Sequence, residues 1–268
     1  GARLILVGDI DQLPPVGAGE PLKDLMSWGY VPIVRLKRIF RQEEGSGIVE
    51  NAALIRKGEM CVPDEAGEFR IIYAADDEDA YRIVMDLCRE LNYGNEENKM
   101  LLQVLSPMYR GVCGVDHLNE SLQEMIHGEK VPDGMKFFPG DKVMQTRNDY
   151  EKGIYNGDVG TVWTPTPQKV FVRYFDKEVV YEGEERFDLR LAYAVTVHKS
   201  QGSEYETVIF ILRPSQHNML QRNLLYTGVT RARKNTILVT APDALRRALA
   251  IQHTGNRYSL FLPFLNHE

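Results

Sequence analysis

The sequence AYAVTVHKSQGSEY (residues 192–205) carries more information about this chain than any other stretch. A short apolar run leads into a turn of small and polar residues, and a second apolar run, residues 207–212, follows directly. A glycine permits a tight turn with exposed backbone N–H groups, which bind anionic oxygens well. The turn gathers seven such residues in nine positions, more than a purely structural turn needs: Thr196, His198, Lys199, Ser200, Gln201, Gly202 and Glu204. It therefore predicts a site that contacts phosphate or sugar.

Three other stretches combine an apolar segment with polar residues of the same kind. LILVGDIDQLPPVGAG (residues 4–19) reads as a buried strand followed by a loop that contains Gln12 and Pro14. LKRIFRQ (residues 36–42) and LLYTGVTRARK (residues 224–234) place arginines beside apolar residues. The planar guanidinium group of arginine suits phosphate oxygens better than a point charge does. Any one of these motifs is a weak signal, but four of them in this order are a strong one.

The four stretches resemble motifs III, IV, V and VI of the superfamily 1 helicases, in the order in which that family carries them. LSPMYRGVCGVDHLNESLQ (residues 105–123) resembles in particular the RecD-like branch, superfamily 1B or the exodeoxyribonuclease V alpha-chain family. The resemblance covers nearly the whole chain and fades after about residue 250. It implies an ATP-dependent helicase that translocates 5′→3′ on single-stranded DNA in repair and recombination.

The resemblance also implies roles for individual residues at the nucleotide. Gln12 matches the motif III glutamine that senses the γ-phosphate, and Arg41 and Arg231 match the arginines of motifs IV and VI that face it. Hydrolysis develops negative charge on the γ-phosphoryl oxygens, which guanidinium groups stabilise. Glu204 matches the motif V carboxylate that contacts the ribose, and Gly202 leaves room for that approach.

A translocating motor cannot read sequence, so its DNA contacts fall mainly on the backbone through hydroxyls, amides and a few cations. Motif V supplies the first candidates. A second group follows a predicted strand and precedes a predicted helix N-terminus, where anions bind readily. The predicted DNA-binding residues are Pro14, Ser106, Pro107, Arg110, Asn119, Thr196, His198 and Lys199.

The sequence lacks two parts that ATP hydrolysis needs. It contains no G-x-x-x-x-G-K-[ST] phosphate loop and no Asp-Glu pair after an apolar strand upstream of Gly8. In the family both belong to the first RecA-like motor domain. We therefore expect a C-terminal fragment of a helicase, from motif III onward. ATP and Mg²⁺ would be bound mainly by the absent first domain, and this piece alone would not hydrolyse ATP.

Strands and helices alternate along most of the chain, which predicts a mostly parallel sheet covered on both faces. This pattern fits an α/β, RecA-like P-loop NTPase-type fold. The expected strands are residues 3–7, 32–36, 69–73, 100–105, 207–212 and 235–239. The expected helices are residues 20–28, 46–57, 76–91, a helix with Val115, Leu118 and Leu122 on one face, 221–228 and 242–250.

Residues 138–188 break this alternation with short β-like runs and no amphipathic helix. Asn156-Gly157 is a hairpin signal because both turn positions need positive φ. We expect a small antiparallel barrel inserted into the second motor domain, where RecD-like helicases carry an SH3-like insertion. It either stabilises the motor or offers a DNA-guiding or protein-binding surface, with candidates at Arg147, Asn148, Tyr150 and Tyr155.

We expect four segments. Residues 1–30 are the C-terminal remnant of the first motor domain, residues 31–137 and 191–268 are the two parts of the second motor domain, and residues 138–190 are the SH3-like insertion between them.

The net charge of the chain is −6, although residues 191–268 carry nine Lys and Arg against four Asp and Glu. A motor needs only a local phosphate track, so this balance does not exclude DNA.

Other classes find no support in the sequence. Three scattered cysteines without C-x-x-C spacing argue against a disulfide framework or zinc site and for a reducing, cytoplasmic setting. No apolar run of 18 residues is present, and the histidines lack metal-ligand spacing. Two alternatives stay open: the helicase part of a conjugative relaxase, and a single-stranded DNA-binding or adaptor module without motor activity.

Overall fold

The computed structural model describes residues 2–14, 17, 19–36, 45–252 and 263–264. Its centre is a five-stranded sheet with the order β1-β10-β9-β2-β8, in which every neighbouring pair is parallel. The strands are β1 (Phe69–Tyr73), β2 (Leu102–Ser106), β8 (Ala194–Thr196), β9 (Tyr205–Leu212) and β10 (Ala232–Thr240). The predicted α/β fold with a parallel sheet is confirmed.

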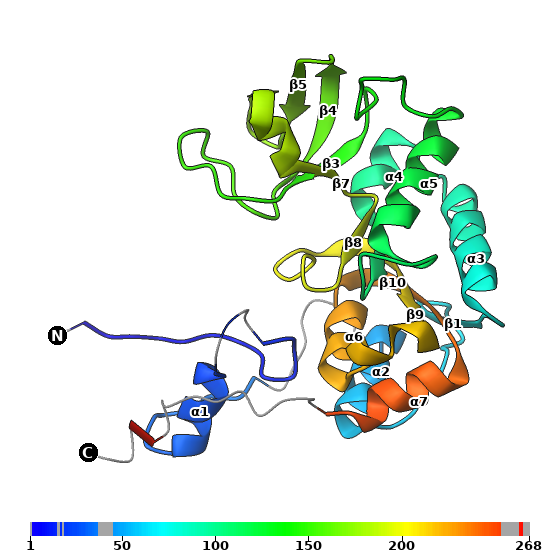
Figure 1. Cartoon of the computed structure of the whole chain (residues 1–268). Helices are drawn as coiled ribbons and strands as arrows, with labels where there is room; N and C mark the ends of the chain where they lie inside the picture. Colours follow the sequence, from blue (N-terminus) through cyan, green and yellow to red (C-terminus); the bar gives the residue numbers. More distant parts are fainter. Residues whose placement is uncertain (1, 15–16, 18, 37–44, 253–262, 265–268) are drawn as a thin grey trace.

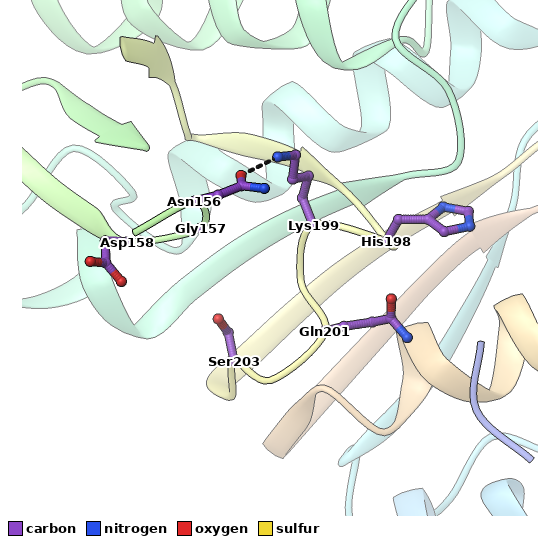
Figure 2. A pocket seen from close by; sticks show the side chains of 7 residues that line it. All are labelled: Asn156, Gly157, Asp158, His198, Lys199, Gln201 and Ser203. Atoms are coloured by element: carbon purple, nitrogen blue, oxygen red, sulfur yellow. Dashed lines mark hydrogen bonds between the residues drawn. The ribbon is translucent and has the colours of Figure 1, made fainter. Parts of the chain in front are cut away.

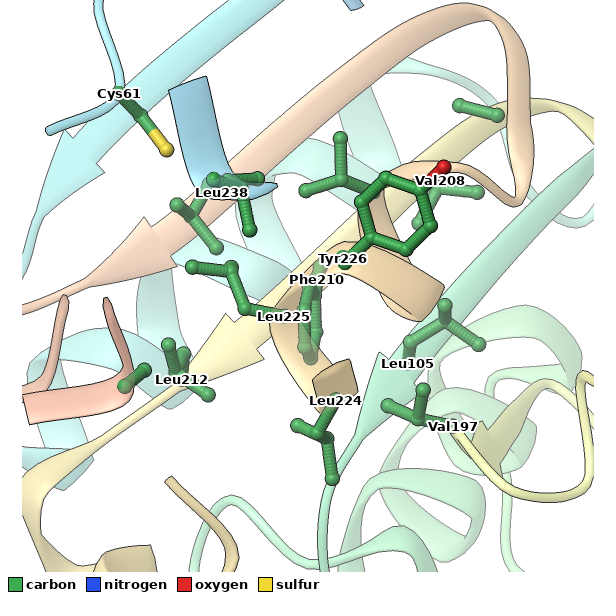
Figure 3. Packing of buried hydrophobic residues seen from close by; sticks show 14 of the residues in the cluster. Cys61, Leu105, Val197, Val208, Phe210, Leu212, Leu224, Leu225, Tyr226 and Leu238 are labelled. Atoms are coloured by element: carbon green, nitrogen blue, oxygen red, sulfur yellow. The ribbon is translucent and has the colours of Figure 1, made fainter. Parts of the chain in front are cut away.

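Alternation along the central strand β9 divides the core into two layers. Val208, Phe210 and Leu212 pack into one hydrophobic cluster, which Figure 3 shows from close by, and Ile209 and Ile211 pack into the other. Successive side chains of a strand point to opposite faces, so the continuous apolar run at residues 208–212 must be covered on both.

Two sets of helices provide this cover (Figure 1). The first cluster includes residues of α2 (Gly47–Lys57), α6 (Arg222–Val229) and α7 (Pro242–Ala250). The second includes residues of α3 (Asp77–Glu90) and α5 (Val115–His127), with α4 (Glu96–Leu101) leading into β2. The other helical segments are α1 (Pro21–Trp28) and the 3₁₀ turns η1 (Gly183–Asp188) and η2 (Pro214–Met219).

Local sequence signals set the helix ends. The side chain of Ser46 accepts a hydrogen bond from Ile48 N at the start of α2, and Asp76 accepts one from Asp79 N at the start of α3. These caps explain why the helices begin at the residues expected from the sequence, since short polar side chains satisfy the first free amides of a helix. In α6, Gly228 lies so close to Phe210 that a Cβ there would be 2.5 Å from the ring. This contact brings α6 close to β9.

A second sheet is antiparallel, has the order β6-β5-β4-β3-β7, and lies at the top of Figure 1. Its strands are β3 (Lys142–Gln145), β4 (Val159–Pro165), β5 (Lys169–Arg173), β6 (Glu178–Glu182) and β7 (Leu189–Leu191). They enclose a separate hydrophobic cluster with Val143, Val162, Val172 and Tyr181. The predicted β insertion is confirmed, and we refer to residues 138–191 as the inserted barrel.

The Asn156-Gly157 prediction was wrong in its detail. Gly157 has φ +103°, but Asn156 has no positive φ, so the pair does not form the expected two-residue hairpin turn. β3 and β4 are instead connected by residues 146–158, which include an antiparallel bridge between Asp149 and Ile154. A bond from Tyr155 N to the Asp158 side chain and a backbone bond from Gly157 N to Gln145 O shape this longer connection in place of the expected two-residue turn.

Two expected strands do not form. Residues 3–7 and 32–36 have no regular secondary structure and no ladder partner within the described chain. Leu4, Val7, Val34 and Leu36 are each more than 80% exposed. A buried parallel strand requires neighbours that pair its backbone and cover its faces. The described sheets provide neither for these two segments.

Buried polar groups join the inserted barrel to the parallel sheet. Asp141 is fully buried and accepts hydrogen bonds from Gln123, from the Tyr193 hydroxyl at 2.8 Å and from Phe138 N. The next residue, Lys142, donates to Leu102 O at 3.1 Å and to Gln103 Oε1 at 3.0 Å. Such groups must be paired when they leave water, so they fix the orientation of the insertion.

Lys142 predicts a pH dependence of stability. Burial, followed by the charge of Lys99, lowers the pKa of Lys142 from 10.5 to about 7. Between these two pH values the unfolded chain binds a proton that the folded chain lacks, so this contribution to the free energy of unfolding rises with pH. We expect wild type to gain stability relative to Lys142→Met between pH 7 and pH 10 in urea unfolding. A stability difference that stays constant over this range would contradict the assignment.

Candidate nucleotide and nucleic-acid site

The turn between β8 and β9 is held by its own polar groups. Ser200 N donates to Thr196 O at 3.1 Å, and Ser200 Oγ donates to Val197 O at 2.8 Å. Gly202 has φ +84° and is exposed, which supplies the predicted tight turn. We call residues 196–204 the motif V loop. Because its backbone is internally bonded, the loop presents its side chains in a defined arrangement.

Asn119 positions the strand that leads into this loop. Its Nδ2 donates to Ala194 O at 2.9 Å, and its Oδ1 accepts from Ala194 N at 2.9 Å. The side chain is buried in α5 against the edge strand β8. The Asn119 amide therefore pairs with the backbone of the edge strand as a neighbouring strand would. Its donor and its acceptor both have partners within the protein.

The segment around Gln12 contacts the motif V loop and helix α6. Leu13 N donates to Thr227 Oγ1 at 2.8 Å, and Leu13 O accepts from Gln201 Nε2 at 2.7 Å. The Tyr226 hydroxyl donates to Asp9 Oδ2 at 3.1 Å. Burial and the nearby Asp9 carboxylate raise the pKa of Tyr226, so this hydroxyl keeps its proton. Residues more than 200 positions apart are thereby brought together.

Arg231 lies beside Gln12. Its side chain is only 3% exposed, with Nε donating to Thr227 O and Nη1 to Ser203 O, both at 3.1 Å. Nη2 donates to Gln12 Oε1 at 3.4 Å. The structure thus brings together two of the three residues expected at the γ-phosphate. The third, Arg41, lies outside the described residues.

The expected ribose contacts lie at the outer end of the same loop. Glu204 is exposed, and its Oε2 is 3.9 Å from Arg233 Nε. Gly202 lies two residues before it. The contact with Arg233 is long and exposed, and such ion pairs contribute little energy.

A cavity of about 290 Å³ lies between the motif V loop and the inserted barrel. Figure 2 shows Lys199 reaching across it, with Nζ donating to Asn156 Oδ1. Burial, followed by the charge of Arg190, lowers the pKa of Lys199. The cavity is lined by polar residues from both units: Asn156, Gly157, Asp158, His198, Lys199, Gln201 and Ser203.

The remaining predicted DNA-binding residues are dispersed. Ser106 is fully buried, and its hydroxyl donates to Cys113 O at 2.6 Å and accepts from Gln216 Nε2 at 3.1 Å. Pro107 is also buried, whereas Arg110 is exposed and Pro14 is half-buried beside Leu13. Thr196 is buried, and its Oγ1 accepts from Lys199 N at 3.3 Å.

Thr227 and Tyr226, which hold the Gln12 segment, were not identified from the sequence. Thr227 lies on α6, whereas Arg231 lies beyond the end of this helix at Val229 and reaches back to the Thr227 carbonyl. The partners of Thr227 and Tyr226 in the Gln12 segment are about 215 positions away in sequence. No local pattern could identify those contacts.

Comparisons with known proteins agree with this arrangement. Family profiles match as an AAA domain over residues 1–71, an ATP-dependent RecD-like DNA helicase SH3 domain over 118–174 and a UvrD-like helicase C-terminal domain over 191–239. The chain is similar to the ATP-dependent RecD2 DNA helicase of Deinococcus radiodurans, with 36% identity covering 97% of this chain and 36% of the relative. It is also similar to the RecBCD enzyme subunit RecD of Mycolicibacterium smegmatis, with 32% identity covering 96% of this chain and 49% of the relative.

Among solved structures, the Pif1 helicase from Bacteroides in complex with ADP-AlF3 and single-stranded DNA has the same fold. The TM-score is 0.54 at 20% identity, over 97% of this chain and 65% of that one. The parallel sheet, its insertion and the profile matches together define a helicase motor domain.

Within that class, the chain belongs to the RecD-like helicases. It spans between about a third and a half of the length of these two relatives.

Proposed function

We propose that this chain is the C-terminal motor half of an ATP-dependent helicase that translocates 5′→3′ on single-stranded DNA in repair and recombination. The observation that carries the proposal is the contact between Gln12 and Arg231 beside the motif V loop. Gln12 and Arg231 are chemically suited to a γ-phosphate, and Arg231 also donates to Ser203, which lines the polar cavity. This link between the two candidate sites supports a motor that couples ATP hydrolysis to stepping.

For ATP, the proposed roles follow the chemistry of the side chains. Arg231 and Arg41 would stabilise the charge that develops on the γ-phosphoryl oxygens, and Gln12 would orient the attacking water or sense the phosphate. Glu204 would contact the ribose hydroxyls, with Gly202 leaving space for the sugar. Arg231 would have to exchange its present backbone partners for phosphate oxygens, which makes its site dependent on closure of the motor.

Within the residues that the structure describes, no group of three or more His, Cys, Asp or Glu residues is arranged to hold a metal ion. We propose that Mg²⁺ and the phosphate-binding loop belong mainly to the first motor domain, as the resemblance to the family implies.

For DNA, the proposed track begins at Thr196, His198 and Lys199. The cavity beside Lys199 is lined by polar residues of the motif V loop and the inserted barrel, and a groove that tracks a nucleic-acid backbone carries positive charge, which Lys199 would supply. Arg110 would extend the track as an exposed cation, and Pro14 would contact bases from the Gln12 segment. Ser106, Pro107 and Asn119 would contribute by shaping the neighbouring strand ends, since their side chains are buried.

The inserted barrel has two proposed roles. Tyr150 and Tyr155 are exposed on the connection between β3 and β4, with ring centroids 6.1 Å apart. Their proximity to the cavity through Asn156 supports a DNA-guiding role. A protein partner is the other proposed role, supported by the exposed Trp163 and Phe175 on the same barrel.

The proposed domain limits are residues 1–30, 31–137, 138–190 and 191–268. No helix in the described residues is long and apolar enough to cross a membrane. We propose a cytoplasmic location because the DNA substrate of a bacterial-type repair motor lies there.

The proposed function is tested by DNA-stimulated ATP hydrolysis, comparing this chain with the full-length gene product. We expect turnover only in the longer protein, together with binding of single-stranded DNA by both. DNA binding without turnover in the full-length protein would favour a binding module instead.

Lys199 offers a separate test of the DNA track. Removing one phosphate contact should weaken binding uniformly across sequences and reduce the salt slope by about 0.7 for a single strand. We expect this for Lys199→Ala in fluorescence anisotropy across a salt series. The matched control is Lys234→Ala, an exposed lysine paired with Glu206 on β9, which should bind as wild type does. Equal slopes for wild type and Lys199→Ala would remove Lys199 from the track.

A further inference from the structure

The peptide of Leu13 joins three segments that lie far apart in sequence. Its N–H donates to Thr227 Oγ1 on α6 at 2.8 Å, and its C=O accepts from Gln201 Nε2 of the motif V loop at 2.7 Å. The Leu13 side chain is buried in the same hydrophobic cluster as residues of α6. The position of this residue is therefore fixed on three sides, by two hydrogen bonds and by packing.

Thr227 contributes to both sides of the candidate site. It is fully buried, and its hydroxyl donates to Asn223 O at 2.7 Å, which orients the oxygen to accept from Leu13 N. Its backbone carbonyl accepts from Arg231 Nε at 3.1 Å. One residue thus holds the segment of Gln12 through its side chain and the guanidinium of Arg231 through its main chain.

The contact between Gln12 and Arg231 depends on this arrangement. Gln12 directly precedes Leu13, and its Oε1 lies 3.4 Å from Arg231 Nη2. A shift of the Leu13 peptide would move Gln12 relative to the arginine. Small displacements of catalytic groups are costly, since a misplacement of about 1 Å can reduce turnover by about 10²-fold.

We propose that Thr227 is a positioning residue for ATP hydrolysis, whose hydroxyl holds the Gln12 segment in register with Arg231. This inference rests on the proposed function and adds a residue to it. Thr227 does not touch the nucleotide; it acts through Gln12. Gln12 and Arg231, which come from different segments, would then keep a fixed position relative to each other, because Thr227 holds both.

Thr227→Val tests this proposal with little change of shape, because it replaces the hydroxyl by a methyl group. Leu13 N then loses its acceptor. In the full-length gene product we expect the kcat of DNA-stimulated ATP hydrolysis to fall by about tenfold to a hundredfold, with the KM for ATP nearly unchanged. Thr227→Ser keeps the hydroxyl and should restore most of the activity.

The matched control is Thr240→Val. Thr240 is also a fully buried threonine, and its hydroxyl donates to Leu212 O at 2.8 Å, away from the Gln12 segment. Thr240→Val should lose about as much unfolding free energy as Thr227→Val and should keep the wild-type kcat. Equal losses of kcat in both variants would mean that Thr227 has only a structural role and would overturn the proposal.

A double-mutant cycle with Gln12→Ala tests the route of the effect. If Thr227 acts through Gln12, the kcat of the double variant should be no lower than the kcat of Gln12→Ala alone. If the fold-losses of kcat in the two single variants multiply in the double variant, the proposal is overturned. A wild-type full-length protein without DNA-stimulated turnover would instead refute the proposed function itself.

Amide hydrogen exchange tests the contact in this chain without any measurement of activity. Thr227→Val should speed the exchange of the Leu13 amide, and an unchanged exchange rate would contradict the proposed contact.

Discussion

Arg231→Ala in the full-length gene product is expected to lower DNA-stimulated ATP turnover by about 10³-fold or more, while single-stranded DNA is still bound. A guanidinium aimed at the γ-phosphate acts mainly on the transition state, where the charge on the phosphoryl oxygens changes. The proposed DNA contacts are assigned to other side chains, Thr196, His198 and Lys199, although Arg231 also donates to Ser203 O of the motif V loop. The measurement is steady-state ATPase activity together with anisotropy of labelled single-stranded DNA.

Two controls separate this effect from loss of structure. Arg231 is buried and donates to Ser203 O and Thr227 O, so the alanine variant also loses stability, which thermal unfolding will measure. Arg231→Lys keeps a charge but not the planar set of donors, and should still be slow. Arg233→Ala changes an exposed neighbour and should be active. Turnover near the wild-type level in Arg231→Ala would remove this residue from the catalytic site.

Arg213→Ala is expected to destabilise the fold more than any surface change. Arg213 is only 2% exposed, and its Nη1 donates to Ala74 O at 2.9 Å and to Thr240 O at 3.0 Å, joining the ends of β1 and β10. Its Nε also donates to Asp77 at the start of α3. In the alanine variant Thr240 O keeps the bond from Ala74 N, whereas Ala74 O and Asp77 lose the guanidinium. A buried acceptor left without a donor costs about 1–3 kcal/mol. We expect urea unfolding to show a loss of about 3 kcal/mol or more.

The control for this prediction is Arg246→Ala. Arg246 pairs with Asp243 one turn away on α7, and both side chains are more than 60% exposed. Exposed pairs of this kind contribute about 0.3–0.5 kcal/mol. If the two variants unfold at the same urea concentration, the bonds of Arg213 contribute far less to stability than their burial implies.

Much of the fold could be predicted because its signals are local. Ser46 and Asp76 begin helices where capping residues precede apolar periodicity, and β9 is apolar at nearly every position as a central parallel strand must be. The change from helical to β-like periodicity near residue 138 marked the inserted barrel. These features depend on neighbours in sequence, which the sequence displays directly.

Errors arose where the outcome depends on distant partners. The apolar run at residues 3–7 has the composition of a buried strand, but composition does not provide the neighbouring strands that would pair with it. Ser106 and Asn119 follow a strand end or lie on a helix, as anion-binding residues do, and their polar atoms have partners inside the protein; their DNA-binding role stays a prediction. Whether a polar side chain points outward or inward depends on packing that no local pattern contains.

The way in which the barrel joins the parallel sheet has a consequence for the history and engineering of this protein. Near the two ends of the barrel, Lys142 and Ala192 are adjacent, since Ala192 N donates to Lys142 O at 2.8 Å. The segment between two such neighbouring positions forms a closed loop, and closing a longer loop costs little more than closing a short one. A module attached in this way can be exchanged for another of different binding preference, provided that the new one supplies its own core and keeps Asp141 and Lys142.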